Sequence, residues 1–239
     1  MTRAFSNLLI YAFVVMISTA EGATKVKLVQ FSGEVKVRRG LEEKWERANI
    51  DMLLEEIDTI LTGENGEAVL EFGEGATFRL GGNSVLDIAD LRKITEQELF
   101  MILMSRKIRK IKPNGDKAPA RTGDVSTIRG EPYVTQEEKS VSSSEWRRWE
   151  VNAAQALSAQ NLLTNAALKW HRIKEKFPGQ PDCGEASFYL AQTFEQLRQT
   201  GQARDEYQLS VEQAHEQNCE DGETKRRVEI ARRELERQN

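Results

Sequence analysis

The sequence FGEGATFRLGG occupies residues 72–82, in a chain that is otherwise rich in charged residues. A glycine-rich run of this kind either cradles a phosphate group or marks the turn between two strands. A phosphate loop needs a further glycine and a Lys-Ser/Thr pair before a helix, whereas the TFRL that follows Gly75 is strand-like. The run therefore predicts a β-hairpin, with Glu74-Gly75 as a two-residue turn and with Phe72 and Phe78 on the buried side.

Apolar and polar residues alternate on both sides of this hairpin, for example in VKLVQFSGEVKV and EAVLEF. A period of two places one face of each strand in a core and the other in water. Turn residues such as Asn65-Gly66 separate the alternating runs at short intervals. The sequence therefore predicts a compact antiparallel β domain at residues 25–134.

Residues 90–112 leave two interpretations open. They form an amphipathic helix with Asp90 as its N-cap, or two strands with Phe100, Ile102 and Met104 on one face. The pattern alone favours neither.

The composition changes after Tyr133. Residues 135–144 are polar, lack apolar periodicity and are predicted to be a linker. Ser144 is the expected N-cap of a helix that ends at Leu157, and further helices are expected at 160–176, 185–198, 202–217 and 223–237. The predicted fold class is α+β in two domains, with a mostly-β N-terminal domain and an all-α domain at residues 145–239.

The helical half contains an internal repeat, because three pairs of small or aromatic residues are each 37 residues apart. The pairs are Ala154 and Ala191, Ala166 and Ala203, and Trp170 and Tyr207. Small residues let two helices approach closely, and the aromatic residue fills the groove beside them. This spacing resembles that of tetratricopeptide repeats, which implies helical hairpins that dock a protein partner on their concave face. A generic helical bundle is the alternative.

The first residues predict export. Arg3 precedes an apolar run of ten residues, Leu8 to Ile17, and small residues at Ser18 and Ala20 fit a signal peptidase site. We expect a signal peptide at residues 1–20 that is cleaved near Ala20, which places the protein in the periplasm or outside the cell. A retained anchor is the alternative, although ten residues are half of what spans a bilayer.

The N-terminal domain resembles the FecR family. The run IDTILTG at residues 57–63 and the run EGATFRLGGNS at residues 74–84 carry the resemblance, and Ile128-Arg129-Gly130 matches the closing segment of the family. The resemblance implies an exported, mostly-β and non-catalytic domain, and it favours strands rather than a helix for residues 90–112. Family members sense an outer-membrane transporter and signal through a membrane helix to a cytoplasmic segment.

The composition argues against several kinds of chemistry. The net charge is −4, with 34 basic and 38 acidic residues, so nucleic acid is not an expected partner. The two histidines, His171 and His215, are expected at the helix surface rather than in a catalytic triad. No metal site or cofactor is predicted. Cys183 and Cys219 each precede a predicted helix at equivalent places, and a disulfide between them is one of two open outcomes.

Two groups of residues are candidates for contact with a partner or with the cell envelope. The first is the basic run Arg106, Lys107, Arg109 and Lys110, for which protection of a sheet edge against aggregation is the alternative. The second group is aromatic, and packing in the interior is its alternative. It comprises Trp146, Trp149, Trp170 and Tyr207.

These observations together predict a non-catalytic exported binding or scaffold protein. Its FecR-like domain is expected to recognise a cell-envelope component, and its repeats are expected to dock a protein partner. The alternative is a periplasmic sensor that takes part in FecR-type transmembrane signalling through a membrane partner.

Overall fold

The computed structural model describes residues 25–110, 142–178 and 180–237, with the backbone alone at 106–110. Within these residues, eight strands come first and six α-helices follow, so the protein is of mixed α+β class. The predicted signal peptide, most of the predicted linker and the segment Ile128-Arg129-Gly130 lie outside the described residues.

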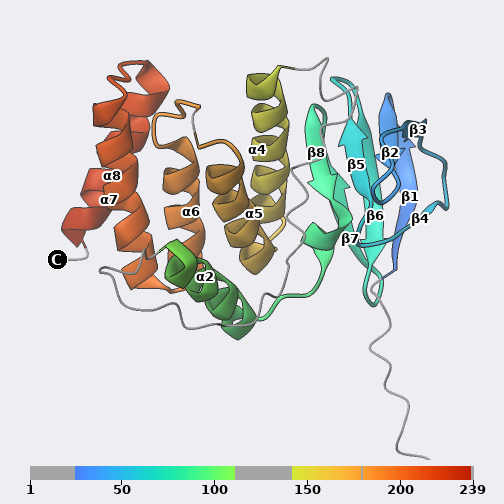
Figure 1. Ribbon diagram of the computed structural model, residues 1–239, viewed down its shortest axis with the longest axis horizontal. Helices are drawn as coiled ribbons and strands as arrows, with labels where there is room; N and C mark the ends of the chain where they lie inside the picture. The colour runs from blue at the N-terminus through green and yellow to red at the C-terminus, as the bar shows by residue number, and fades with distance from the viewer. Residues whose placement is uncertain (1–24, 111–141, 179, 238–239) are drawn as a thin grey trace, which may run out of the picture.

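The strands form two four-stranded antiparallel sheets. Sheet A has the order β4-β1-β6-β7, and its strands are β1 (Val26–Ser32), β4 (Leu53–Leu54), β6 (Glu67–Phe72) and β7 (Ala76–Leu80). Sheet B has the order β3-β2-β5-β8, and its strands are β2 (Val35–Arg38), β3 (Trp45–Arg47), β5 (Thr59–Thr62) and β8 (Ser84–Asp87). Figure 1 shows β1 and β4 on the side of the sandwich that is away from the helical row.

The core of the sandwich confirms the alternation seen in the sequence. Leu28, Leu70 and Phe78 of sheet A are fully buried, as are Val37 and Ile60 of sheet B. Each strand thus places its alternate apolar residues in one shared core.

The turn of the β6–β7 hairpin is longer than predicted. Phe72 pairs with Ala76, so three residues rather than two make the turn. Gly73 and Gly75 both have positive φ values, of 59° and 88°, which suits glycine at both positions. Phe78 is fully buried as predicted, while Phe72 is only half-buried.

Residues 96–110 form a helix, which corrects the preference for strands that the FecR resemblance implied. Helix α2 (Glu96–Lys110) begins after Thr95, whose Oγ1 accepts a hydrogen bond from the Glu98 backbone N–H at 3.1 Å. Asp90 is not the N-cap, because it lies in the preceding 3-10 turn η1 (Ile88–Leu91). Leu99 is buried and Leu103 is half-buried, which is helical rather than strand-like spacing.

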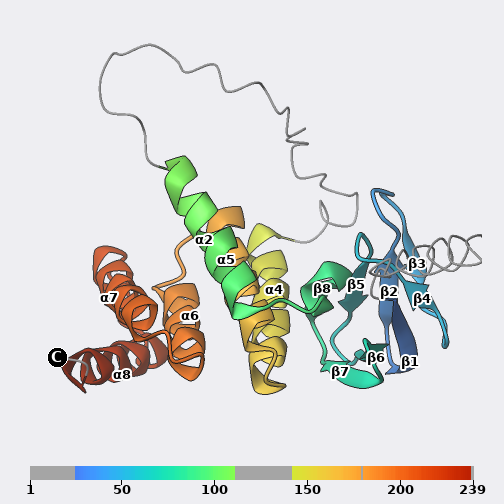
Figure 2. The same cartoon turned by 90° about the horizontal axis from the view of Figure 1, so that it is seen from below.

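Five further helices follow in a row: α4 (Ser143–Ala159), α5 (Leu163–Lys176), α6 (Glu185–Gln196), α7 (Thr200–Glu216) and α8 (Gly222–Arg237). The N-cap of α4 is Ser142 rather than the predicted Ser144, and Ser142 forms a capping box with Glu145. Short connections make successive helices neighbours, and α2 lies across α5 (Figure 2). The repeat positions Ala154, Ala191 and their counterparts are buried, as expected of residues that pack helix against helix.

Helix α4 covers the outer face of sheet B, so the molecule has three layers there. Trp45, Leu61 and Val85 point outward from the sheet and are nevertheless buried, because they pack against Trp146 of α4. The ring centroids of Trp45 and Trp146 are 6.4 Å apart in an edge contact. Both views show α4 beside β8 (Figures 1 and 2), so the sandwich is docked on the first helix of the row.

Candidate interaction surfaces

Side-chain amides of α4 bind the backbone of the sandwich. Gln160, which follows α4, accepts a hydrogen bond from the Arg79 backbone N–H and donates one to the Arg79 carbonyl, both at 2.7 Å. The Gln160 amide thus forms the pair of hydrogen bonds that a further strand would form with the edge strand β7. Asn152 donates to the Asn83 carbonyl at 2.6 Å. Arg79 and Asn83 belong to the run that carries the FecR resemblance, so this run faces the helices.

The start of α5 holds the segment between the sandwich and α2. Asn165 is buried and its Nδ2 donates to the carbonyls of Asp90 at 2.8 Å and Arg92 at 2.7 Å. Thr164 donates to the Ile94 carbonyl at 3.0 Å. These bonds satisfy backbone acceptors that the strands do not reach, and they attach the sandwich to a second helix.

A cluster of charges lies at the same junction, with Asp90, Glu150 and Lys169 buried and its other members partly exposed, and we refer to it as the ion cluster. Lys169 of α5 is only 1% exposed, and its ammonium contacts Glu150 of α4 and lies 3.1 Å from Asp90 Oδ2. Asp90, which is also 1% exposed, pairs in addition with Arg172. The Nζ atom of Lys176 lies 2.9 Å from Oε1 of Glu150. The cluster comprises Asp87, Asp90, Glu150, Lys169, Arg172 and Lys176, so three carboxylates balance three cations.

Burial and pairing oppose each other in the pKa values of this cluster. Burial raises the pKa of Asp87, but the charges of Lys169 and Arg172 outweigh it and hold that pKa below its usual value. Burial lowers the pKa of Lys169, but the charges of Glu150 and Asp87 outweigh it and raise that pKa. Both groups are therefore charged in the folded protein at neutral pH.

The ion cluster predicts a loss of stability at both ends of the pH range. Folding lowers the pKa of Asp87. Its contribution to the free energy of unfolding is therefore present above about pH 4 and is lost as the pH falls further. Folding raises the pKa of Lys169. Its contribution to the free energy of unfolding is therefore present below about pH 10 and is lost as the pH rises further. Urea unfolding as a function of pH measures both limbs. In D87N the acid limb should be shallower than in the parent, and an unchanged acid limb would contradict the assignment.

The sequence pattern does not predict the ion cluster. Charged residues are usually solvated, and the pattern around Asp90 suggests only a helix cap. One signal is present, since Lys169 stands between Leu168 and Trp170 in a helix whose repeat predicts burial. A charged residue inside a buried stripe indicates a paired charge.

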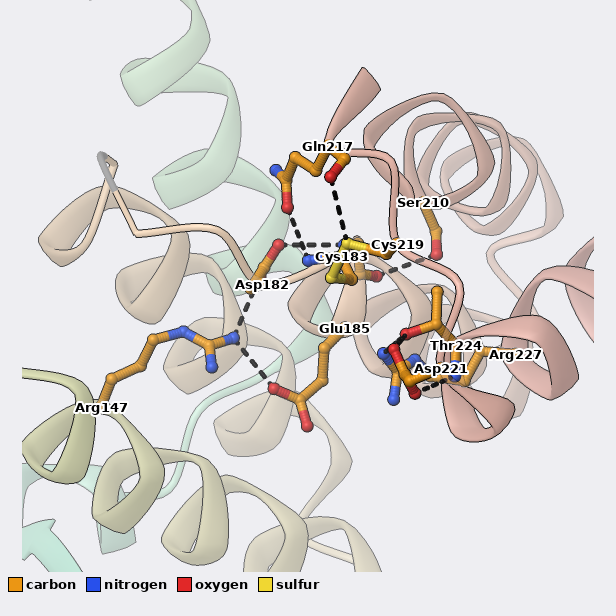
Figure 3. The surroundings of a disulfide bond; sticks show 11 residues. Arg147, Asp182, Cys183, Glu185, Ser210, Gln217, Cys219, Asp221, Thr224 and Arg227 are labelled. Carbon is orange, nitrogen blue, oxygen red and sulfur yellow. Dashed lines mark hydrogen bonds and ion pairs between the residues drawn. A yellow bond between two sulfur atoms is a disulfide. The ribbon is translucent and has the colours of Figure 1, made fainter. Parts of the chain in front are cut away.

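A disulfide lies in the second half of the helical row (Figure 3). Cys183 and Cys219 are joined, with Cα atoms 5.9 Å apart, so the pairing left open by the sequence is present. Gln217 accepts a hydrogen bond from the Cys183 backbone N–H at 2.7 Å. The disulfide thus links the start of α6 to the connection between α7 and α8.

Arg147 links α4 to the same region. Figure 3 shows its guanidinium between two carboxylates, Asp182 at 3.1 Å and Glu185 at 3.0 Å. All three side chains are largely buried, so this pair of contacts is weakly screened by solvent. The disulfide and Arg147 together tie the first and last helices of the row to α6.

Three large apolar side chains of the sandwich are exposed on the β2–β3 connection, on β4 and on the β4–β5 connection, and we call them the distal patch. Leu41, Leu53 and Ile57 are 90%, 55% and 67% exposed. Their loops are held by buried Asp58, which accepts hydrogen bonds from Arg39 at 2.8 Å and from the backbone N–H of Glu55 at 2.9 Å. The patch is therefore apolar and exposed on ordered loops.

Three of the aromatic candidates are inaccessible to a partner. Trp146, Trp170 and Tyr207 are 6%, 0% and 1% exposed, so their partner role is corrected to packing in the interior. Trp149 is half-buried and packs against the Trp45–Trp146 cluster. Burial follows from position, because these rings fill the grooves between adjacent helices and between α4 and the sheet.

The four basic candidates Arg106, Lys107, Arg109 and Lys110 occupy the last turns of α2, and their side chains lie outside the described part of the structure. Because α2 is a helix, protection of a sheet edge no longer accounts for them. His171 Nδ1 lies 3.6 Å from Glu175 Oε2, one turn along α5. His215 lines a groove between α7 and α8. Among the described residues, no group of His, Cys, Asp or Glu is arranged to hold a metal ion.

No helix within residues 25–110, 142–178 and 180–237 is long and apolar enough to cross a membrane. Comparison with known proteins gave no match to a family model, to a curated protein or to a solved structure.

Proposed function

We propose that the protein is a non-catalytic, exported binding protein of the cell envelope. Its FecR-like sandwich recognises an envelope protein through the distal patch, and its tetratricopeptide-like helices dock a second protein. The observation that carries the proposal is the distal patch itself, since Leu41 and Ile57 line the same surface hollow and exposed apolar groups that lie together mark interaction sites.

The energetics of the distal patch suit binding. Complete burial of a Leu or Ile side chain contributes about 1.5 to 3 kcal/mol relative to exposure, so covering the patch can supply several kcal/mol. The loss of loop entropy on binding offsets little of this free energy, because the loops are already held in place. Asp58 is 3% exposed and accepts hydrogen bonds from Arg39 and from the backbone N–H groups of Gly40 and Glu55.

The neighbouring strands offer a mode of recognition. Within the described residues, β3 and β4 are the outer strands of their sheets and each pairs on one side only. An extended segment of a partner can add to such an edge while its apolar side chains contact Leu41 and Ile57. We therefore infer a protein ligand rather than a polysaccharide.

The helical half supports a second contact. The groove between α7 and α8 has a volume of about 500 Å³, with Val211, Ala214 and Val228 among its lining residues and Arg232 and Glu229 beside them. It lies at the open end of the row, where a further helical hairpin would stack in a longer repeat array. This surface is the one that we assign to the docked protein.

Site-specific photo-crosslinking in the source cells tests the proposed function. A photoreactive residue at Leu41 or Ile57 should yield a discrete adduct with an envelope protein, whereas the same residue at Gln30, exposed elsewhere on the sandwich, should not. The variant L41D/I57D should bind that protein at least tenfold more weakly, which corresponds to about 1.4 kcal/mol. Its stability should change by less than about 0.5 kcal/mol per site, because both side chains are exposed. Equal adducts at positions 30, 41 and 57, or none, would refute the assignment of the distal patch.

A further inference from the structure

Helix α2 leaves three large apolar side chains uncovered, and we call them the apolar ridge. Phe100, Met101 and Met104 are 49%, 63% and 41% exposed, whereas Leu99 is fully buried. With 3.6 residues per turn, positions 100, 101 and 104 share one face of the helix, turned away from the face that packs through Leu99 and Leu103. The ridge is thus a second apolar stripe on a helix whose first stripe already faces the core.

Charge is divided unevenly along the same helix. Glu96 and Glu98 lie in its first turn, and no acidic residue follows up to its end at Lys110. Four of the last five residues are basic, in a chain whose net charge is −4. At about 100° per residue, position 107 lies next to position 100 around the helix, whereas positions 106 and 110 fall on the side of Leu99 and Leu103.

We propose that α2 lies on the surface of a membrane that contains anionic lipid. An apolar face bordered by Lys and Arg is the arrangement by which an interfacial helix buries its apolar side chains among acyl chains and keeps its cations at the headgroups. Of the candidate occupants, an anionic bilayer is the one that matches both properties of α2, the apolar ridge and the adjoining cations.

Neither the helix dipole nor a protein groove accounts for both properties of α2. Basic residues near the C-terminus of a helix favour its dipole, but the dipole does not account for three exposed apolar side chains. A protein groove could cover the ridge, but it does not account for four cations gathered in the last turns of the same helix. The distal patch differs in this respect, since Arg39 beside it is paired with Asp58 and Glu46. The proposal for α2 is therefore independent of the proposed function of the distal patch.

Co-sedimentation with vesicles tests the proposal. The chain from Glu21 onward, which keeps every described element, is mixed with vesicles of phosphatidylcholine with or without phosphatidylglycerol. We expect binding to the anionic vesicles, weak binding to the neutral ones, and a decrease as salt is raised. F100S/M101S/M104S should reduce binding at least tenfold, and so should R106Q/K107Q/R109Q/K110Q.

The matched control is L41S/I57S, which removes exposed apolar side chains from the distal patch and should leave vesicle binding unchanged. Circular dichroism and thermal unfolding should show that all variants keep the parent fold, because the exchanged residues of the apolar ridge and the distal patch are exposed. The proposal is overturned if the parent binds no vesicles, if lipid charge makes no difference, or if the control loses as much binding as the ridge variant.

Discussion

Replacement of Lys169 by methionine is expected to lower the free energy of unfolding by about 3 to 5 kcal/mol. The side chain is 1% exposed and faces Glu150 and Asp90, neither of which is more than 5% exposed. Methionine fills a similar volume but leaves three carboxylates against two cations, and an unbalanced buried charge is costly. Urea unfolding at neutral pH measures the loss.

A second variant separates charge balance from packing. K169M/E150Q again has equal numbers of carboxylates and cations, so it should recover part of the stability that K169M loses. The control is R233M, which breaks an ion pair with Glu229 whose side chains are 69% and 72% exposed. Exposed pairs of this kind contribute about 0.3 to 0.5 kcal/mol. If K169M were no more destabilised than R233M, the ion cluster would not hold the sandwich to the helices.

Removal of the disulfide in C183S/C219S is expected to cost about 4 kcal/mol. The bond joins residues 36 apart in the sequence and so restricts a long segment of the unfolded chain. The native contacts around it, such as Ser210 with the Gly184 carbonyl at 2.8 Å, do not need the bond to form. We therefore expect a folded variant with a lower melting temperature.

A reducing agent provides the control for this prediction. Dithiothreitol should lower the melting temperature of the parent to that of C183S/C219S and should leave the variant unchanged. Hydrogen exchange should quicken chiefly in α6, α7 and α8, the helices that the bond connects. A parent protein insensitive to complete reduction, verified by mass, would show that the bond contributes nothing to stability.

The sequence was most informative where a pattern depends on local geometry. Alternation placed Leu28, Leu70 and Phe78 in the core because a strand turns successive side chains to opposite faces. The 37-residue repeat placed Trp170 and Tyr207 inside the helical row, because each ring fills a groove between adjacent helices. Predicted helix ends were correct to within a few residues, since caps and breakers act locally.

The sequence was least informative where distant contacts compete with local preference. FMILM at residues 100–104 fits a strand or a helix, and its helix forms where α5 supplies a surface for Leu99. The turn length at Gly73–Gly75 depends on the register between β6 and β7, which glycine content does not specify. The disulfide required two helix starts to lie within reach of each other, and only the packing of α6 and α7 decides that distance.

By itself, the sequence determined that this protein has a β half with one buried face per strand and a helical half, because periods of two and of about 3.6 residues are properties of the backbone. The tertiary structure decided that the two halves meet. The outer face of sheet B packs against Trp146 of α4. The backbone carbonyls of Arg79 and Asn83 accept hydrogen bonds from side-chain amides at the end of α4 and within it. The tertiary structure also buried Lys169 beside Asp90. The physical reason is that a charge in the interior is tolerated only with its partner, and here the partners of Lys169 come from η1 and α4, of which η1 lies far from both helices in the sequence.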